Sequence, residues 1–343
     1  MLDSIGRINQ EDLMFLLGAG ASIDAGLHAV AKLTGELRSR LPLLSDVNGI
    51  TRPEFGLIFD FIEKHDPEIS KNYERFFKWI SLILDIRKDP FRKILKTEMD
   101  DSLIKVMGHL SFVIGNCISE ILYSIKTAPE YLSKIADFLP SQGRLKVFSL
   151  NYDCCLEEAC QANNIDVITG FDPVTKMWNP SLFLSKEKGI NLYKLHGSLR
   201  WFGTRDESLS DDQFLCNHIL RELKAEERNF LPSHIKVSPT PELILGPGSK
   251  IQPDDPFLTL FYEFHSSLQK AKIYIIIGYG YQDEHVNSVL DHAVDRRVHI
   301  IDVNPGGPCS KYLADSCYHH LSLSAKNALM NGNILAEIKR LTI

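Results

Sequence analysis

Short apolar runs separated by helical patterns occupy the two ends of the chain. The first run, Leu13–Leu17, leads directly into the glycine turn Gly18–Ser22, and a buried strand followed by such a turn and a helix opens an α/β unit. Similar runs predict strands at 145–150, 192–195, 243–245, 273–277 and 298–303, with helices at 154–163, 256–268 and 284–294. This alternation predicts an α/β fold, a Rossmann-like parallel sheet with helices on both faces.

The stretch between the first strand and the next is helical instead. From about Ala31 to Leu139 apolar residues recur at three- and four-residue spacing, most clearly between Leu103 and Ile121. We therefore predict a Rossmann-like domain made of residues 1–30 and 140–343, with an all-helical module inserted at 31–139. The region 203–240 is polar and irregular apart from one predicted helix, Asp212–Glu226, and we expect a surface excursion that serves as a lid or a docking loop.

Composition narrows the class of protein. The 343 residues are 44% hydrophobic and carry a net charge of −6, which excludes a disordered chain and argues against direct nucleic-acid binding. No uninterrupted apolar run approaches the roughly 18 residues that span a bilayer, and the N-terminus lacks the apolar core of a secretory signal. We therefore expect a cytoplasmic protein without membrane contact. The seven cysteines form no C-x-x-C pair, so we expect reduced core thiols and no metal site.

The glycine turn after the first strand is the first candidate for chemistry. Gly18 and Gly20 lack side chains that would block a ligand, so that backbone amides can approach a phosphate at a helix N-terminus, and Ser22 adds a hydroxyl donor. The turn is not the usual dinucleotide fingerprint, because the third glycine would fall on Ile23, and no P-loop lysine follows. An ordinary glycine turn between strand and helix remains the alternative.

Polar residues also follow the next two predicted strands. Asn151 and Asp153 lie at the carboxyl end of the strand 145–150, where open α/β sheets bind ligands, although Asn and Asp are also favoured helix N-caps. His196 follows the strand 192–195 and precedes a glycine. Imidazole titrates near neutral pH, so this histidine is suited to proton transfer.

The last two predicted strands end in a similar way. Gly278-Tyr279-Gly280 and then Asp283 follow the strand 273–277, while Asp302 and Asn304 lie at the end of the strand 298–303. An Asp or Asn there can hydrogen-bond a ribose or an adenine edge, and a simple turn is the alternative for both segments.

Taken in this order, five motifs resemble the sirtuin-like NAD-binding superfamily. They are G-A-G-A-S at 18–22, S-L-N-Y-D at 149–153, L-H-G-S at 195–198, G-Y-G at 278–280 and I-D-V-N at 301–304. The resemblance implies a Rossmann-like sheet with a smaller helical module and NAD+ bound in the cleft between them. It also implies that His196 is the catalytic histidine and that the amides around Gly18–Ser22 hold the pyrophosphate. The implied NAD-binding residues are Gly18, Ala19, Gly20, Ser22, Asp24, Asn151, Asp153, Gly278, Tyr279, Asp302 and Asn304.

The chain departs from sirtuin deacylases in three places. Those enzymes hold a structural zinc with two C-x-x-C pairs after the catalytic histidine, whereas only Cys216 lies between His196 and residue 308 here. Their Pro-Asp-Phe-Arg run is replaced by His28–Ala31, and their Thr-Gln-Asn by Ser149–Asn151. The pattern is more similar to the zinc-less branch of the superfamily that acts in bacterial antiphage defence, which hydrolyses NAD+.

The resemblance therefore predicts an NAD+ hydrolase that cleaves the nicotinamide–ribose bond to give nicotinamide and ADP-ribose. In this hypothesis Asn151 orients the water or a ribose hydroxyl, neutral His196 acts as general base and Asp153 holds the carboxamide. It also implies a homo-oligomer or a separate activator, such as a hexameric ATPase translocase, a short Argonaute or a phage protein. Two alternatives stay open, an NAD-dependent protein deacylase or ADP-ribosyltransferase, and a non-catalytic sensor of NAD+ or ADP-ribose.

Overall fold

The structure is a computed structural model that describes residues 12–46, 48–88, 101–208, 218–245 and 254–342. The chain divides into two compact units, one comprising 1–27, 126–243 and 249–343, the other 28–125 and 244–248. Residues 126–139, which the sequence assigned to the helical module, lie with the sheet unit. The physical reason is that the 3-10 helix Glu130–Phe138 packs there: the Phe138 and Phe15 rings are 5.2 Å apart, and the Tyr131 hydroxyl donates to the Ala21 carbonyl at 2.5 Å.

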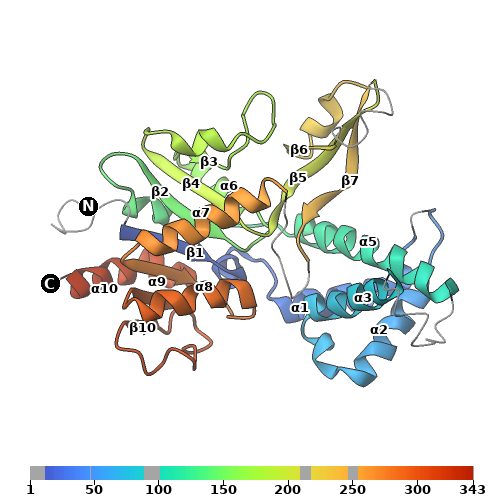
Figure 1. The fold of residues 1–343 in the computed structure, drawn as a ribbon, viewed down its shortest axis with the longest axis horizontal. Helices are drawn as coiled ribbons and strands as arrows, with labels where there is room; N and C mark the ends of the chain where they lie inside the picture. Colours follow the sequence, from blue (N-terminus) through green and yellow to red (C-terminus); the bar gives the residue numbers. More distant parts are fainter. Residues whose placement is uncertain (1–11, 47, 89–100, 209–217, 246–253, 343) are drawn as a thin grey trace. The chain divides into compact units, whose positions relative to one another are not determined.

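Seven parallel strands form the main sheet of the first unit, in the order β10-β9-β8-β1-β2-β4-β3 (Figure 1). Their bounds are β1 Leu13–Leu17, β2 Arg144–Ser149, β3 Val167–Ile168, β4 Gly189–Lys194, β8 Ile273–Ile277, β9 His299–Val303 and β10 Tyr318–Leu321. The α/β class and the parallel sheet predicted from the sequence are confirmed. Every residue of β1 and β8 is buried, as expected for strands covered on both faces.

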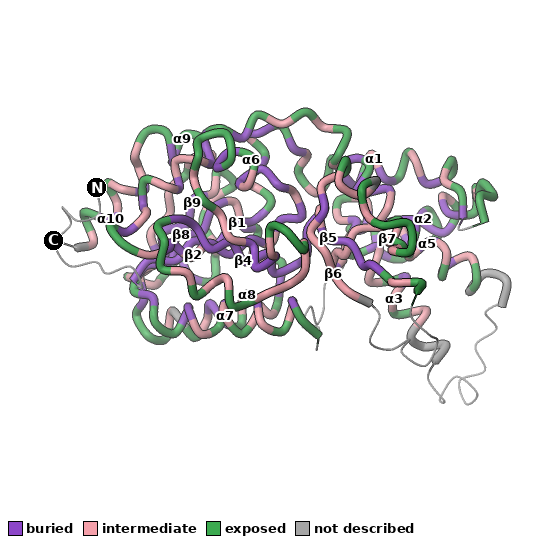
Figure 2. Tube along the Cα trace, turned by 90° about the horizontal axis from the view of Figure 1, so that it is seen from above, coloured by how far each residue is buried: buried purple, intermediate pink, exposed green. Residues whose placement is uncertain are grey.

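Helices cover both faces of this sheet. Figure 2 shows α6 (Cys155–Ala162) and α9 (Ala325–Met330) on one side of the strands and α7 (Phe257–Lys270) and α8 (Glu284–Asp295) on the other. The chain ends in α10 (Asn333–Thr342). On the α7 side, Phe148 of β2 lies 5.1 Å from the Phe264 ring, and both side chains are fully buried. This packing leaves the carboxyl ends of the strands as the place where polar residues gather.

A second, three-stranded antiparallel sheet follows β4, and two predictions were wrong here. It consists of β5 (Gly197–Asp206), β6 (His218–Glu222) and β7 (Ile235–Leu243), with β5 in the middle. The predicted helix Asp212–Glu226 contains β6, and its part at 212–217 lies outside the described residues. Of the predicted parallel strand at 243–245, only Leu243 lies in a strand, as the last residue of the antiparallel β7.

The wrong helix has a physical cause. Apolar residues recur here at helical spacing, namely Leu215, Ile219, Leu220 and Leu223. A period read along the chain does not report that a segment pairs with a strand some fifteen residues earlier, and that pairing decides the structure. Phe202 of β5 is registered with Arg221 of β6, and the Trp201 indole donates to the Glu222 carboxylate at 3.3 Å.

The second unit is helical. Its helices are α1 (Val30–Arg40), α2 (Glu54–His65), α3 (Tyr73–Lys88) and α5 (Asp101–Ser124), with short 3-10 turns at Leu41–Leu43 and Pro67–Ser70. Among the described residues one helical stretch, Lys105–Ser124, is by length and composition apolar enough to cross a membrane. Its residues Leu110, Ile114, Ile118 and Ile121 are fully buried in the apolar core of this unit, which is typical of a core helix.

A buried aspartate organises the loop between α1 and α2. Asp46 accepts hydrogen bonds from the backbone amides of Asn48 (2.8 Å) and Ile50 (3.1 Å) and from the Arg52 guanidinium at 2.7 Å, and His109 lies 3.5 Å away. Burial alone would raise the pKa of Asp46, but the hydrogen bonds from Ile50 and Arg52 outweigh it and lower the pKa to about 2. Asp46 is therefore an ionised, structural carboxylate.

Candidate functional site

The strand order places a topological switch point between β1 and β8. The chain continues from β1 to β2 on one side of this pair and from β8 to β9 on the other. Parallel sheets bind ligands at such a point, outside the carboxyl ends of the strands. The predicted site residues follow β1, β2, β4, β8 and β9, so the fold brings all five segments to one edge of the sheet.

The loops after β1 and β8 contact each other through their backbones. The Gly18 amide donates to the Ile277 carbonyl at 2.9 Å and the Gly20 amide to the Gly278 carbonyl at 2.8 Å. A Cβ on Gly20 would lie 2.6 Å from the Gly278 Cα, and a Cβ on Gly278, which has φ +64°, would lie 2.3 Å from the Ala21 nitrogen. These glycines are therefore required for the close approach of two protein segments.

This contact uses backbone amides of the glycine turn that could otherwise bind a phosphate. Gly18, Gly20 and Ala21 each donate their amide to a backbone oxygen, that of Ala21 going to Gly18 at 2.9 Å. Ala19 is the exposed residue of the turn, and Ser22 is buried. Pyrophosphate binding at this turn stays a prediction, with three of its amides already engaged.

Asn151 is tied to the same turn. Its side-chain amide donates to the Gly18 carbonyl at 2.9 Å and to the Ser22 hydroxyl at 3.2 Å, and the residue is 8% exposed. The amide oxygen is the part of the side chain that these two bonds do not use. Asp153, in contrast, accepts the Cys155 amide at the start of α6 at 3.0 Å. The structure thus separates the two residues, with Asn151 against the glycine turn and Asp153 against a helix.

His196 follows β4, the strand that neighbours β2, and Asn151 follows β2. Strands β2 and β4 are registered with Ser149 opposite Lys194, so Asn151 and His196 each follow two residues beyond a registered pair. His196 is buried, and its Nε2 lies 3.2 Å from Oδ2 of Asp283, which is also buried. The sequence placed Asp283 at a strand end without this partner, because nothing local reports a contact between the β4 and β8 loops.

Asp283 is held by several further bonds. Its Oδ1 accepts the backbone amides of His285 (3.0 Å) and Val286 (3.1 Å) at the start of α8, and its own amide donates to the Tyr279 hydroxyl at 3.1 Å. The Tyr279 carbonyl in turn accepts the side-chain amide of Asn304 at 3.2 Å. Hydrogen bonds and close contacts therefore link the β8 loop with His196 on one side and with the end of β9 on the other.

Two other predicted binding residues are engaged elsewhere. Asp302 is fully buried and accepts the Tyr318 hydroxyl, and burial raises the pKa of its carboxyl group. Asp24 accepts the Lys326 amide at the start of α9 at 2.7 Å. Contact of either residue with NAD+ stays a prediction.

A buried ion pair supports the segment that carries Asp153. The Lys194 ammonium lies 3.2 Å from the Glu157 carboxylate, donates to the Asp153 carbonyl and has a side chain that is 1% exposed. Burial opposes the charge of Lys194, but the field of Glu157 raises its pKa above the usual range. Sequence reasoning missed this lysine, since a charged residue inside an apolar strand gives no sign of its partner.

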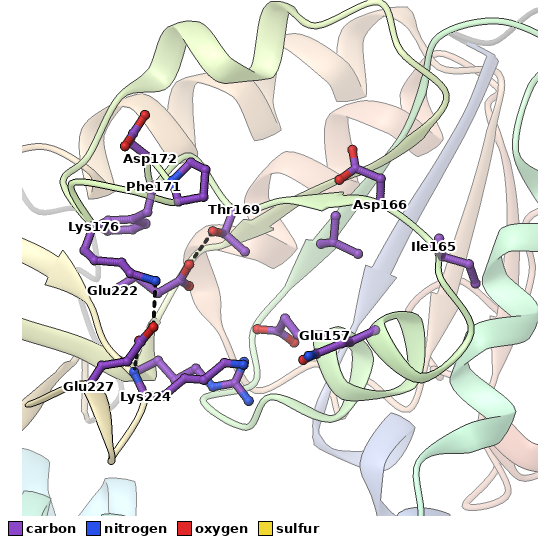
Figure 3. Close-up of a pocket in the computed structure, with 14 residues that line it drawn as sticks. Glu157, Ile165, Asp166, Thr169, Phe171, Asp172, Lys176, Glu222, Lys224 and Glu227 are labelled. Atoms are coloured by element: carbon purple, nitrogen blue, oxygen red, sulfur yellow. Dashed lines mark hydrogen bonds and ion pairs between the residues drawn. The ribbon is translucent and has the colours of Figure 1, made fainter.

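A pocket of about 310 Å³ lies on the other side of Glu157 (Figure 3). Thr169 donates to Glu222 at 2.7 Å and Lys176 pairs with Glu227 at 2.7 Å at its rim. Its described lining has five carboxylates and three cationic side chains and includes none of the predicted site residues. The pocket is therefore separate from the site at the strand ends. Its excess of negative charge also disfavours a pyrophosphate.

The described cysteines are free thiols. Burial raises the pKa of Cys117, Cys154 and Cys160 to about 12, which makes them unreactive at neutral pH. Cys216 lies outside the described residues. Within the part of the chain that the structure describes, no group of three or more His, Cys, Asp or Glu side chains is arranged to hold a metal ion.

Residues 145–303 match the family model described as SIR2-like domain. Similar solved structures include a triple mutant of a Sir2 homologue with 2′-O-acetyl ADP-ribose (16% identity, TM-score 0.44, covering 96% of this chain and 92% of that one). Others are a Sir2 homologue in complex with NAD (15%, 0.44, 96% and 90%) and Sir2Tm bound to a propionylated peptide (11%, 0.41, 98% and 97%). The comparison with curated proteins gave no match.

The matched segment runs from β2 to β9 and contains Asn151, His196, Asp283 and Asp302. It therefore includes four of the five strand ends at which the motifs lie, and β1, which supplies the fifth, is paired with both β2 and β8. The similarity to the SIR2-like domain thus lies in the segment that supplies most of the predicted site.

Proposed function

We propose that this protein hydrolyses NAD+ at the edge of the sheet where β1, β2, β4 and β8 end. The observation that carries the proposal is the placement of Asn151 and His196 at matching positions of adjacent strands, with Asn151 tied to the glycine turn. A binding module alone would need neither an oriented amide nor a buried histidine at this point. The SIR2-like match over the same strands supports NAD+ as the substrate.

The reaction does not require a strong nucleophile from the protein. The bond between nicotinamide and C1′ of the ribose breaks with its electron pair going to nicotinamide, which leaves as a neutral molecule. Water forms the new bond to C1′ and loses a proton. In the proposed mechanism the side-chain oxygen of Asn151 orients that water or a ribose hydroxyl, and neutral His196 accepts the proton.

The cellular role is part of the same proposal. The zinc-less motif pattern supports a place in bacterial antiphage defence, where an effector in the cytoplasm depletes NAD+ once it is switched on. Activation would come from self-assembly or from a separate partner.

The test is to incubate the purified full-length chain with NAD+ and to quantify nicotinamide and ADP-ribose. Asn151→Ala should abolish release, and Asn163→Ala is the matched control, because the side chain of Asn163 donates to the Ala159 carbonyl at the end of α6. Parallel reactions contain an acylated peptide. Release that depends on the peptide would contradict hydrolysis and favour deacylation, and NAD+ binding without release would favour a sensor.

A further inference from the structure

The contact between His196 and Asp283 bears on where the imidazole carries its proton. Nε2 of His196 lies 3.2 Å from Oδ2 of Asp283, outside hydrogen-bond geometry. Beside a carboxylate, which only accepts hydrogen bonds, the ring is more stable with its hydrogen on Nε2 than with the Nε2 lone pair facing Oδ2. In the neutral ring the lone pair then lies on Nδ1, the nitrogen on the other side of the ring.

Asp283 is itself fixed in orientation. Its Oδ1 accepts two backbone amides at the start of α8, which leaves Oδ2 as the oxygen directed at His196. The Tyr279 hydroxyl holds the backbone amide of Asp283, and Tyr279 is buried. A rigid carboxylate that is 8% exposed, beside a histidine that is 6% exposed, interacts with the ring in a medium that screens charge weakly.

We infer that Asp283 is the positioning residue of this site, which holds His196 with its proton on Nε2 so that Nδ1 acts as the base. The catalytic part of this inference rests on the proposed function. When Nδ1 takes the proton from water, the ring becomes a cation, and the carboxylate of Asp283 stabilises it.

The substitution Asp283→Asn isolates this role from helix capping. Asparagine is as good an N-cap as aspartate, and its side-chain oxygen must take the place of Oδ1 to accept the amides of His285 and Val286. Its NH2 group then faces Nε2 of His196 and donates to it. The ring must place its proton on Nδ1 instead, and the base is lost while the fold is kept.

The primary readout is the protonation of the ring in the absence of NAD+. Two-bond 1H–15N spectra of protein labelled at histidine distinguish a protonated ring nitrogen from an unprotonated one, and His196→Ala identifies the signals of His196. We expect protonated Nε2 in the wild type and protonated Nδ1 in Asp283→Asn. Asp291→Asn is the control, since it removes another carboxylate of α8 whose partners are Lys311 and Tyr312.

The second readout is turnover of NAD+ by the full chain. Asp283→Asn should lower kcat about 10²-fold or more with little change in KM, and Asp291→Asn should leave both unchanged. An unchanged His196 tautomer in Asp283→Asn overturns the inference, as does an exchanged tautomer with normal turnover. If the wild type releases no nicotinamide, the proposed function fails, while the spectra still decide whether Asp283 sets the proton of His196.

Discussion

Each of the two units contains a buried aspartate beside a histidine. Asp46 in the helical unit lies 3.5 Å from His109, and Asp283 in the sheet unit lies 3.2 Å from His196. Both aspartates also accept two backbone amides. The pairs differ in the histidine, whose side chain is 30% exposed at His109 and 7% exposed at His196.

The difference lies in what surrounds each pair. Asp46 already has a cationic partner in Arg52 at 2.7 Å, and its hydrogen bonds close the short loop between Ser45 and Thr51. His196 follows the parallel strand β4, at the position that matches Asn151 beyond β2, at the edge where open sheets bind ligands. A histidine beside an aspartate therefore does not by itself indicate a catalytic site. The position of the pair in the fold is the evidence that separates the two cases.

Replacing the two histidines tests this comparison most directly. His196→Ala should lower NAD+ turnover by about 10²- to 10⁴-fold, the usual worth of a general base, and His109→Ala should leave it unchanged. Steady-state kinetics measure both, and circular dichroism verifies that each variant stays folded. Equal losses in the two variants would remove the distinction between the pairs.

The contact between Asp283 and His196 depends on a rigid loop between β8 and Asp283. Gly278→Ala places a Cβ 2.3 Å from the Ala21 nitrogen at φ +64°, and we expect it to lower the free energy of unfolding by about 2–5 kcal/mol. Gly332→Ala is the matched control, since Gly332 has φ +68° but nothing within 4 Å of a Cβ, and should cost only about 1–2 kcal/mol. Urea unfolding measures the free energy of unfolding of both variants. Equal losses would show that the close approach of the β1 and β8 loops adds nothing to stability.

Asp46 should reveal its structural role at acid pH. Its pKa falls from 3.8 to about 2 on folding, so its contribution to stability is complete above pH 3.8 and is lost as the pH drops toward 2. The urea midpoint of the wild type should therefore approach that of Asp46→Asn between about pH 4 and 2 and exceed it at neutral pH. A constant difference between the two proteins across that range would contradict the ionised form of Asp46.

Asp302 should show the opposite dependence. Burial raises the pKa of its carboxyl group above 3.8, so the wild type loses stability relative to Asp302→Asn as the pH rises from 3.8 toward the folded value. An asparagine oxygen can still accept the Tyr318 hydroxyl, so the comparison isolates the titration of Asp302. Urea midpoints measured from pH 3 to 7 give the sign, and parallel curves would contradict it.

Strands with local signals could be predicted from the sequence, and strands defined by distant partners could not. The runs Leu13–Leu17 and Ile273–Ile277 coincide with β1 and β8, because a fully buried parallel strand is apolar at every position. Strand β6 alternates less clearly and takes its conformation from β5, so its helical spacing misled the prediction. The short edge strand β3 has two residues and leaves no pattern of its own.

The candidate site follows the same rule. Asn151 and His196 were placed at strand ends, and the register of β2 with β4 sets them at matching positions. The partners of these residues came only with the fold, because Gly18 reaches Asn151 and Asp283 reaches His196 across the sheet edge. The sequence assigned the glycines to a phosphate, whereas the atoms nearest to their missing side chains belong to the neighbouring loop.

That contact between the β1 and β8 loops has a consequence for anyone who redesigns this protein. Each loop supplies glycines that make room for the backbone of the other, and two direct hydrogen bonds join the two segments. Neither loop is therefore an independent module, although about 260 residues separate them along the chain. A chimaera that exchanges only one of them with a homologue should misfold at the sheet edge, whereas exchanging both together should keep their contact.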